Sequence, residues 1–370
     1  MSKICLFCQG LKIELIKLPY TLFRHLGFVD DKKNGTIGRC ENCQLLMNIM
    51  SIAQEKKQAK IHGSLAYAQA SITNQTFLLS NRQRGTRFFL QAELLKGFLK
   101  NKEDARVLDI GCFQGELLLE LYHRFPKAEF HGFDVNKYLK NRFPSKNNFV
   151  FHLTDLSKIK GEFDLICMSQ SMIYIKDIQG LLAHIQRLLK KGGKLFIQLP
   201  DVTNNPCSIL LADQYYYFTP SILRNVLYKA GFDMVLLPNE YFPRDIVAIA
   251  QWVSSHKVWL IKEDASIHRI IKYLNQVKQR LGSISQSKVC VLGTTTTAAF
   301  VDSILGKRIQ FFVDENVNDK NDGVRFRGKR VIAPAVLDAS AHLILPYGSA
   351  NGRIKKRFAR DYHLKSFELI

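Results

Sequence analysis

The sequence lacks a long apolar run, because no uninterrupted stretch reaches the ~18 residues that a membrane-spanning helix needs. Its first residues, Met1 to Cys5, also lack the long apolar region of a secretory signal peptide. With neither feature, we expect no membrane span and a location in the reducing cytoplasm. There, the eight cysteines are expected to be thiols or metal ligands rather than disulfides.

Acidic residues are scarce relative to basic ones. The chain has 32 Asp and Glu against 53 Lys and Arg, which gives a formal net charge of +21. Such a charge attracts nucleotides, phosphorylated sugars, nucleic acid or acidic lipid surfaces, but an ordinary solvated basic surface explains it equally well. The length of 370 residues exceeds one ordinary domain, and the 46% hydrophobic content is typical of a globular protein.

Two CxxC pairs stand near the N-terminus, formed by Cys5, Cys8, Cys40 and Cys43. Each pair offers two thiolates from one tight turn, and two such turns complete a tetrahedral zinc site. Four protein ligands leave no open position, so zinc here is expected to be structural. A redox dithiol is the alternative, although a lone redox pair would not need the second one.

The other cysteines lack ligand spacing and are expected to be small buried residues. They are Cys112, Cys167, Cys207 and Cys290. Between the two CxxC pairs, residues that favour turns predict hairpins joining short strands. They are Gly27, Asp30–Asp31 and Asn34–Gly35.

From Arg87 onward, strands and helices alternate, which predicts a doubly wound parallel sheet. Helices are expected at 87–100, 116–124, 178–190 and 220–230, and strands at 106–110, 129–134, 149–152, 163–168, 194–199, 234–237 and 246–251. In such sheets, ligands bind outside the carboxyl ends of the strands.

Acidic residues follow three successive strands at that edge. Asp109 precedes the turn Gly111-Cys-Phe-Gln-Gly115, whose glycines let the backbone pass close to a ligand. A phosphate loop would more often carry a third glycine or Lys-Ser/Thr, whereas Asp109 suits an ammonium group. Asp134 is placed to accept hydrogen bonds from two ribose hydroxyls, and Asp155 from an adenine amino group.

These residues resemble the class I S-adenosylmethionine-dependent methyltransferases, and the resemblance continues through residues 163–166, 188–195 and 218–232. A nicotinamide-binding fold is the alternative, but it would be expected to show a fuller glycine loop. The resemblance implies S-adenosylmethionine as cofactor. Its expected contacts are Asp109, Gly111, Gly115, Asp134, Asp155, Leu156 and Ser169.

The C-terminal region predicts a second, smaller Rossmann-like α/β unit. Residues 254–282 read as a basic helical connector, and strands are expected at 288–292, 309–313 and 341–345. Thr294–Thr297 is either an anion cradle or a helix cap. We therefore expect three domains: zinc-binding (1–60), methyltransferase (61–253) and C-terminal α/β (254–370).

This three-part layout, with tail residues 312–316, 328–334 and 342–346, resembles the sugar C-methyltransferases of deoxysugar biosynthesis. The resemblance implies an enzyme of carbohydrate biosynthesis whose small-molecule substrate is a nucleotide-linked sugar or glycan precursor. That family lines its pocket with one histidine after the fourth strand and a Glu-His pair further on. The matching positions here are Tyr174, Asp213 and Gln214.

Methylation of a carbon beside a ketone needs a base and a group that steadies the enolate. Asp213 remains able to act as a base, whereas Gln214 does not titrate and Tyr174 would need activation. The methylated atom, carbon, oxygen or nitrogen, therefore stays open. Tyr67 is a candidate lid residue, and Tyr215–Tyr217 either stack on a ligand or pack half-buried.

Two alternatives remain open from the sequence. An RNA methyltransferase fits the charge and a zinc-binding head, but the second α/β unit is an unexpected RNA module and no interleaved Arg/aromatic motif is present. A catalytically silent binding protein fits the three changed pocket residues. The sequence predicts no oligomeric state.

Overall fold

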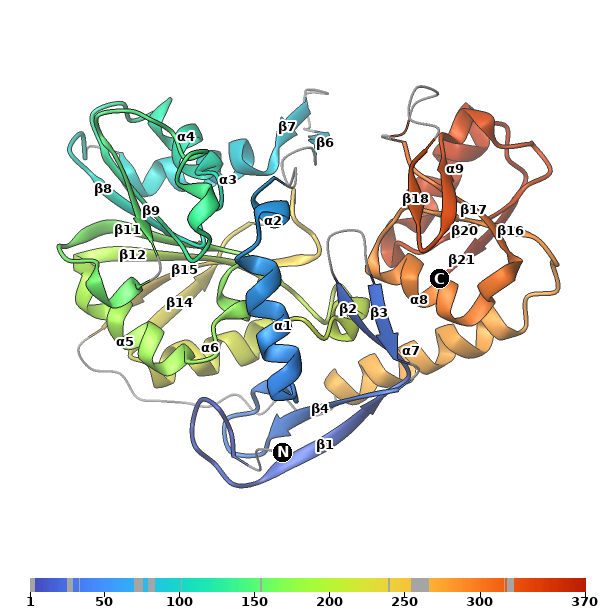
Figure 1. The fold of residues 1–370 in the computed structure, drawn as a ribbon, viewed down its shortest axis with the longest axis horizontal. Coiled ribbons are helices and arrows are strands. Elements are labelled where there is room, and N and C mark those ends of the chain that lie inside the picture. Colours follow the sequence, from blue (N-terminus) through green and yellow to red (C-terminus); the bar gives the residue numbers. More distant parts are fainter. Residues whose placement is uncertain are drawn as a thin grey trace. The chain divides into compact units, whose positions relative to one another are not determined.

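A computed structural model describes residues 4–24, 29–32, 34–69, 76–78, 84–100, 102–153, 155–238, 240–253, 266–315, 317 and 323–370. The chain forms two compact units (Figure 1). The first consists of Met1–Ile16, Thr36–Asn205 and Asp213–Asp264, and the second of Lys17–Gly35, Pro206–Ala212 and Ala265–Ile370. The three-domain division of the sequence stays a prediction, and its boundary at 253/254 adjoins residues outside the described ranges.

The first unit is built around a seven-stranded sheet in the order β10-β9-β8-β11-β12-β15-β14. The strands are β8 (Arg106–Ile110), β9 (Glu129–Asp134), β10 (Phe149–Leu153), β11 (Phe163–Ser169), β12 (Leu189–Pro200), β14 (Phe232–Leu236) and β15 (Asp245–Trp252). This confirms the predicted α/β methyltransferase architecture, with strand order reversing beside β8.

The prediction that this sheet is wholly parallel is wrong for β15. This strand pairs antiparallel with both of its neighbours, β12 and β14. Only residues 237–244 connect β14 to β15. A parallel crossover needs a dozen or more residues, so the short connection requires antiparallel pairing.

Helices cover both faces of this sheet (Figure 1). They are α3 (Arg87–Leu99) and α4 (Glu116–Tyr122) on one face, and α5 (Ile178–Leu188) and α6 (Pro220–Lys229) on the other. On the first face, Leu95 of α3 and Leu117 of α4 share a buried cluster with Val107 and Leu165 of the sheet. This packing fixes the start of α4 against the carboxyl end of β8.

The N-terminal segment forms a four-stranded sheet in the order β1-β4-β5-β13. The strands are β1 (Ile13–Leu18), β4 (Gly35–Cys40), β5 (Leu46–Asn48) and β13 (Tyr216–Tyr217). Two helices follow, α1 (Ile52–His62) and α2 (Leu65–Gln69), and then the ribbon β6 (Thr76–Leu78) and β7 (Arg84–Thr86). The last strand of this sheet thus comes from a segment about 170 residues further along the chain.

The second unit includes the hairpin of β2 (Thr21–Arg24) and β3 (Val29–Lys32). Asp30 and Asp31, predicted in a turn, lie within β3 instead. Gly27, another predicted turn residue, lies outside the described residues. The backbone of both aspartates pairs with β2 instead, because Asp30 lies opposite Phe23 and Asp31 opposite Leu22 in the antiparallel register.

The rest of the second unit confirms the predicted smaller α/β fold. Its sheet has the order β18-β19-β17-β16-β20-β21, with β18 antiparallel at the edge. The elements are α7 (Ser266–Gly282), β16 (Val289–Leu292), α8 (Thr296–Leu305), β17 (Ile309–Val313), β18 (Arg325–Phe326), β19 (Lys329–Ile332), β20 (His342–Leu345), α9 (Asn351–Asp361) and β21 (Ser366–Leu369). Thr295 caps α8, its side chain accepting a hydrogen bond from the Ala298 amide, as the helix-cap interpretation expects.

Two further expectations concern the whole chain. The four cysteines without ligand spacing are all buried, as predicted. Within the described ranges, every helix is too short or too polar to cross a membrane.

Candidate functional site

The turn that follows β8 brings its backbone against the next strand and the next loop. The amides of Gly111 and Cys112 donate to the carbonyl of Phe133 in β9. Gly111 has a φ of +81°, and a Cβ there would lie 2.5 Å from the Cβ of Ser171, so any side chain would be both strained and blocked. Gly115 then starts α4 at a φ of +83°.

Asp134 is oriented by this turn. Its Oδ2 accepts from the Phe113 amide at 3.2 Å, and its Oδ1 accepts from the Asn136 amide at 3.0 Å. Phe113 itself has a φ of +49°, in the region that favours glycine. The backbone therefore adopts the conformation of a glycine turn although an aromatic side chain stands there.

Asp109, Glu116 and Asp134 form an acidic cluster around the turn, in which Asp109 is buried and the other two residues are half-buried. Asp109 is 3% exposed, and its Oδ1, like both carboxylate oxygens of Glu116, is buried with no hydrogen bond from any described residue. Burial, and then the charges of Glu116 and Asp134, raise the pKa of Asp109 to about 8. Burial likewise raises the pKa of Glu116 and of Asp134. Such a cluster is electrostatically incomplete without a cation.

The neighbouring strand ends carry the other predicted cofactor contacts. Leu153 of β10 lies opposite Asp134, so Asp155 and Leu156 follow at the same edge of the sheet. The Asp155 side chain is 41% exposed and caps a 3-10 turn, its Oδ1 accepting from the amide and hydroxyl of Ser157. Ser169 ends β11 and accepts a hydrogen bond from Gln91 of α3 at 2.7 Å. The sheet thus places the predicted cofactor residues on four adjacent strand ends, β10, β9, β8 and β11.

Asp213 and Gln214 lie in a buried segment held by the N-terminal part of the chain. The two side chains are 7% and 2% exposed. Gln58 of α1 donates to the Asp213 carbonyl at 2.6 Å, and the Asn48 side chain donates to the Gln214 carbonyl at 3.1 Å. The Asn48 amide donates to the carbonyl of the next residue, Tyr215, at 2.8 Å. Three consecutive carbonyls are therefore fixed from β5 and α1.

The tyrosines of this segment pack rather than stack on a ligand. Tyr216 and Tyr217 form β13, pair with Met47 and Leu46 of β5, and are almost fully buried. The Tyr216 hydroxyl donates to the Lys176 carbonyl. This excludes the ligand-stacking interpretation for these two residues and leaves Tyr215, which is 9% exposed.

An aromatic cluster joins the predicted catalytic Tyr174 to helices α1 and α2. The ring of His62 meets the Tyr174 ring edge-on with centroids 4.8 Å apart, and its centroid lies 5.1 Å from that of Tyr67. Burial, and then the charges of Asp134 and Asp213, raise the pKa of Tyr67 to about 12. Tyr67 therefore lies within electrostatic range of both a predicted cofactor residue and a predicted catalytic residue, and its lid role stays a prediction.

Sequence reasoning missed several residues of this site. His62, Gln58 and Asn48 precede the methyltransferase pattern, and Glu116 and Gln91 belong to helices whose amphipathic pattern explains them without function. No motif marks any of them. Long-range contacts bring the first three to the site, namely the pairing of β5 with β13 and the hydrogen bond from Asn136 to the end of α1.

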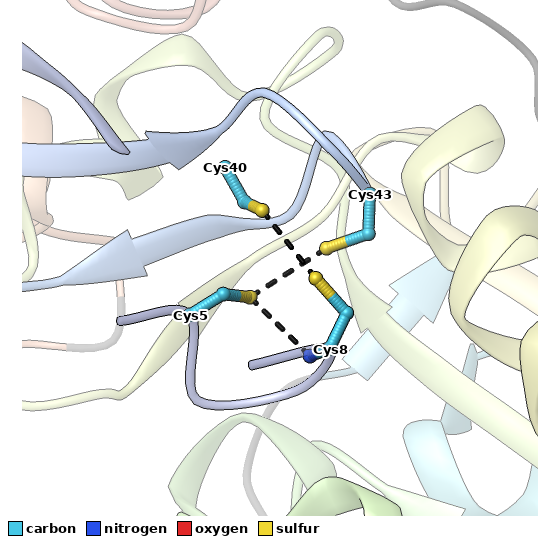
Figure 2. Close-up of side chains that lie close together, drawn as sticks. All are labelled: Cys5, Cys8, Cys40 and Cys43. Atoms are coloured by element: carbon cyan, nitrogen blue, oxygen red, sulfur yellow. Dashed lines mark hydrogen bonds between the residues drawn. The ribbon is translucent and has the colours of Figure 1, made fainter. Parts of the chain in front are cut away.

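The four N-terminal cysteines converge as predicted (Figure 2). The Sγ atoms of Cys5 and Cys43 are 3.6 Å apart and those of Cys8 and Cys40 are 3.5 Å apart, and all four lie within 4.8 Å of one another. A tetrahedral zinc with Zn–S bonds of ~2.3 Å separates its sulfur ligands by ~3.8 Å. The donor set and its spacing fit a tetrahedral thiolate site.

The two CxxC turns have the same local construction. The amide of Gln9 donates to the Cys5 carbonyl, and the amide of Gln44 donates to the Cys40 carbonyl. Both glutamines have positive φ, 59° and 64°. The Cys8 amide also points at the Cys5 sulfur at 3.5 Å (Figure 2). Backbone amides directed at sulfur stabilise thiolates, which are the form that binds a metal.

Without a cation, the four thiol groups cannot all be deprotonated together, and the pKa values of Cys43 and Cys40 shift in opposite directions. Hydrogen bonding with Cys40 and Cys5, together with burial, raises the pKa of Cys43 far above its ordinary value. Hydrogen bonds from Cys43 and Cys5 lower the pKa of Cys40 instead. A divalent cation removes this conflict because it allows all four sulfurs to be thiolates at once.

Comparison with known proteins identifies the fold of the central region. Residues 81–237 match the family model for a methyltransferase domain. A trans-aconitate 2-methyltransferase of Deinococcus radiodurans is 30% identical over 108 residues, 29% of this chain and 42% of that protein. One from Enterobacter sp. is 27% identical over 191 residues, 47% of this chain and 76% of that protein. The chain thus spans less than half of the first relative and about three quarters of the second.

Among solved structures, human N-acetylserotonin methyltransferase in complex with S-adenosylmethionine aligns with a TM-score of 0.38 and 18% identity. The alignment covers 44% of this chain and 52% of that one.

Proposed function

Because residues 81–237 form a class I S-adenosylmethionine-dependent methyltransferase domain, we propose that this protein transfers a methyl group from S-adenosylmethionine to a small anionic acceptor. We further propose that the acceptor is a nucleotide-linked sugar or glycan precursor. The single observation that carries cofactor binding is the acidic cluster of the buried Asp109 with Glu116 and Asp134.

The cluster fits the chemistry of this cofactor. S-adenosylmethionine carries an ammonium group and a sulfonium, so it brings positive charge to carboxylates that have no cation of their own. Asp109 would hold the ammonium group, Asp134 the ribose hydroxyls and Asp155 the adenine amino group. Gly111 and Gly115 leave room for the ligand beside the backbone, with Leu156 and Ser169 at the neighbouring strand ends. When bound, the cofactor supplies an activated methyl group.

The acceptor would lie against Tyr174, Asp213 and Gln214. Asp213 is a candidate base, the Gln214 amide is a hydrogen-bond donor for an acceptor oxygen, and Tyr174 borders the site from the loop after β11. Rigid support of the Asp213–Tyr215 backbone favours catalysis by positioning the two reactants. The three-part layout predicted from the sequence and the net charge of +21 support a sugar diphosphate as the acceptor.

A second acceptor class is a small carboxylic acid methylated on oxygen. The observation that favours it is the naming of both relatives for trans-aconitate, which is an anionic acid. The basic charge of the chain suits either acceptor.

We also propose a structural zinc ion at Cys5, Cys8, Cys40 and Cys43. The convergence of the sulfurs and the matched turns support it. Four thiolate ligands leave no open position for catalysis, so the metal would stabilise the β1-β4-β5-β13 sheet.

Calorimetric titration with S-adenosylmethionine and S-adenosylhomocysteine tests cofactor binding. We expect the wild type to bind both, Asp134→Asn to lose affinity for both, and the exposed Asp104→Asn to bind like the wild type. A wild type that binds neither ligand would contradict the proposal. Methyl-labelled S-adenosylmethionine mixed with a polar small-molecule extract then tests transfer, and mass spectrometry of the labelled product separates a nucleotide sugar from a methyl ester.

A further inference from the structure

His62 ends α1 at a position between the two halves of the proposed site. Its imidazole packs edge-on against Tyr174 and at an angle against Tyr67, with centroids 4.8 and 5.1 Å away. The side chain is half-buried, and no described residue forms a hydrogen bond with either ring nitrogen. Without a hydrogen bond from the described residues, both ring nitrogens are available to a ligand.

The end of α1 is tied to the cofactor side through Asn136. The Asn136 side chain donates to the carbonyls of His62 and Ser64, at 2.6 and 2.9 Å. Its own amide donates to Asp134, the proposed ribose contact. Asn136 is fully buried, so these bonds fix the end of α1 relative to the end of β9.

The preceding turn of α1 is tied to the acceptor side. Gln58 lies one helical turn before His62 and is 4% exposed. Its side chain donates to the Asp213 carbonyl at 2.6 Å. Tyr67, in ring contact with His62, lies within electrostatic range of both Asp134 and Asp213. The imidazole is therefore held between the residues proposed for the cofactor and those proposed for the acceptor.

The imidazole is neutral at physiological pH. Burial lowers the pKa of His62 to about 4, with Tyr67 and Tyr174 as the titratable groups in ring contact with it. A neutral imidazole accepts a proton, which Gln214 cannot do and Tyr174 does only as a phenolate.

We propose that His62, rather than Asp213, is the general base that removes the proton from the methyl acceptor, an inference that rests on the proposed methyltransferase function. The acceptor X–H bond breaks, the proton passes to a ring nitrogen of His62, and the electron pair of X forms the new bond to the methyl carbon. The bond between sulfur and methyl breaks, and its electron pair stays on sulfur, which becomes a neutral thioether. The imidazolium then releases its proton to solvent.

The test uses the full chain, methyl-labelled S-adenosylmethionine and the polar extract. We expect His62→Gln to lower the turnover by about 100-fold or more, the range for a lost general base. Its affinity for S-adenosylhomocysteine should stay at the wild-type value, because the aromatic rings that His62 contacts, Tyr67 and Tyr174, are not among the proposed cofactor residues. His123→Gln, at an exposed histidine of the same unit, is the matched control and should turn over like the wild type.

Chemical rescue separates a base from a packing residue. Added imidazole should restore part of the turnover of His62→Gly, in proportion to the concentration of neutral imidazole, and should leave His62→Gln unchanged because glutamine fills the space. Wild-type turnover in His62→Gln, or no rescue of His62→Gly, would overturn the inference.

Failure of the proposed function gives a different pattern. A wild type that does not bind S-adenosylhomocysteine overturns the function, and the base inference with it. If the wild type binds S-adenosylhomocysteine but transfers no labelled methyl group, reaction with diethyl pyrocarbonate, which modifies accessible neutral imidazoles, tests whether His62 can act as a base. Modification of His62 in the folded chain, found by peptide mass, supports an open neutral imidazole, whereas an unreactive His62 overturns the inference.

Discussion

At the scale of single residues, Asp109 shows that a binding site can lower the stability of the folded chain. Its negative charge is unfavourable at a buried position until a cationic ligand binds. Its carboxyl group is buried beside two other carboxyl groups, and nothing described in the structure supplies a positive charge there. The folded chain therefore prefers this group protonated. A cationic ligand reverses the preference, so ligand affinity and folding stability depend on the same group.

This gives a prediction for Asp109→Asn. The pKa of Asp109 is about 8 in the folded chain, far above its ordinary value. Between those two values the unfolded chain is ionised while the folded chain holds the proton, so stability falls as the pH rises and levels off above about 8. We expect Asp109→Asn to remove that slope and to exceed the wild type in unfolding free energy at pH 8, by on the order of 1–3 kcal/mol.

Urea unfolding at pH 5 and pH 8 measures this difference. The same variant should bind S-adenosylmethionine more weakly, because the amide no longer carries the charge that holds the ammonium group. Asp104→Asn, at an exposed position, should show neither effect. An Asp109→Asn chain that is less stable than the wild type at pH 8 would contradict this account.

At the scale of elements, β13 links the thiolate site to the proposed acceptor site. Two residues separate Cys43 from β5, β5 pairs with β13, and β13 directly follows Asp213–Tyr215. Asn48 and Gln58 fix the carbonyls of that segment. The cofactor turn depends instead on β8 and β9. Metal binding is therefore expected to support the acceptor side more than the cofactor side.

Cys43→Ser tests this division. We expect the variant to lose zinc and to lower turnover by about tenfold or more, the typical effect of misplacing a positioned reactant. Its affinity for S-adenosylhomocysteine should change much less. Zinc content by mass spectrometry, calorimetry and transfer of labelled methyl measure the three quantities. Cys290→Ser is the control because Cys290 is buried in the second unit, and equal losses of cofactor affinity and turnover in Cys43→Ser would refute the division.

The elements also show which parts of the fold and of the candidate site can be predicted from local sequence patterns. The turn after β8 and the acids that follow β9 and β10 were found from the sequence because each stands beside an apolar strand of regular length. The CxxC pairs were found because ligand spacing is itself local. The antiparallel direction of β15 follows from a short connection, and that signal was present in the sequence but outweighed by the alternation of strands and helices.

The pairing of β5 with β13 had no such local signal. The strand β13 consists only of Tyr216 and Tyr217, and its partners Met47 and Leu46 lie far away in the sequence. His62 stands on a helix with little separation of apolar and polar faces, so nothing in its neighbours marks it as functional. Long-range packing, rather than propensity, decides both placements.

At the scale of the whole molecule, the net charge of +21 is larger than the binding of one small anionic acceptor requires. Helix α9 shows how basic residues gather on exposed surface, with Arg353, Lys355, Lys356, Arg357 and Arg360 on eleven residues. Such a field raises the local concentration of any anion, so it acts on the encounter with the acceptor rather than on the chemistry. An RNA acceptor and a small anionic acceptor then differ in how steeply they respond to salt.

We expect methyl transfer to depend on salt concentration only as weakly as the binding of a small anion does. A diphosphate contacts few Lys and Arg side chains, so its apparent KM should rise only severalfold between low and physiological salt. The affinity for RNA would instead fall by about 10³ or more over a comparable range if six or more phosphates were neutralised. Transfer of labelled methyl, measured separately in the small-molecule and RNA fractions of one extract at several salt concentrations, distinguishes the two. Label in the RNA fraction with a steep loss on added salt would assign the basic surface to nucleic acid. Label confined to the small-molecule fraction would assign it to attraction of the proposed acceptor.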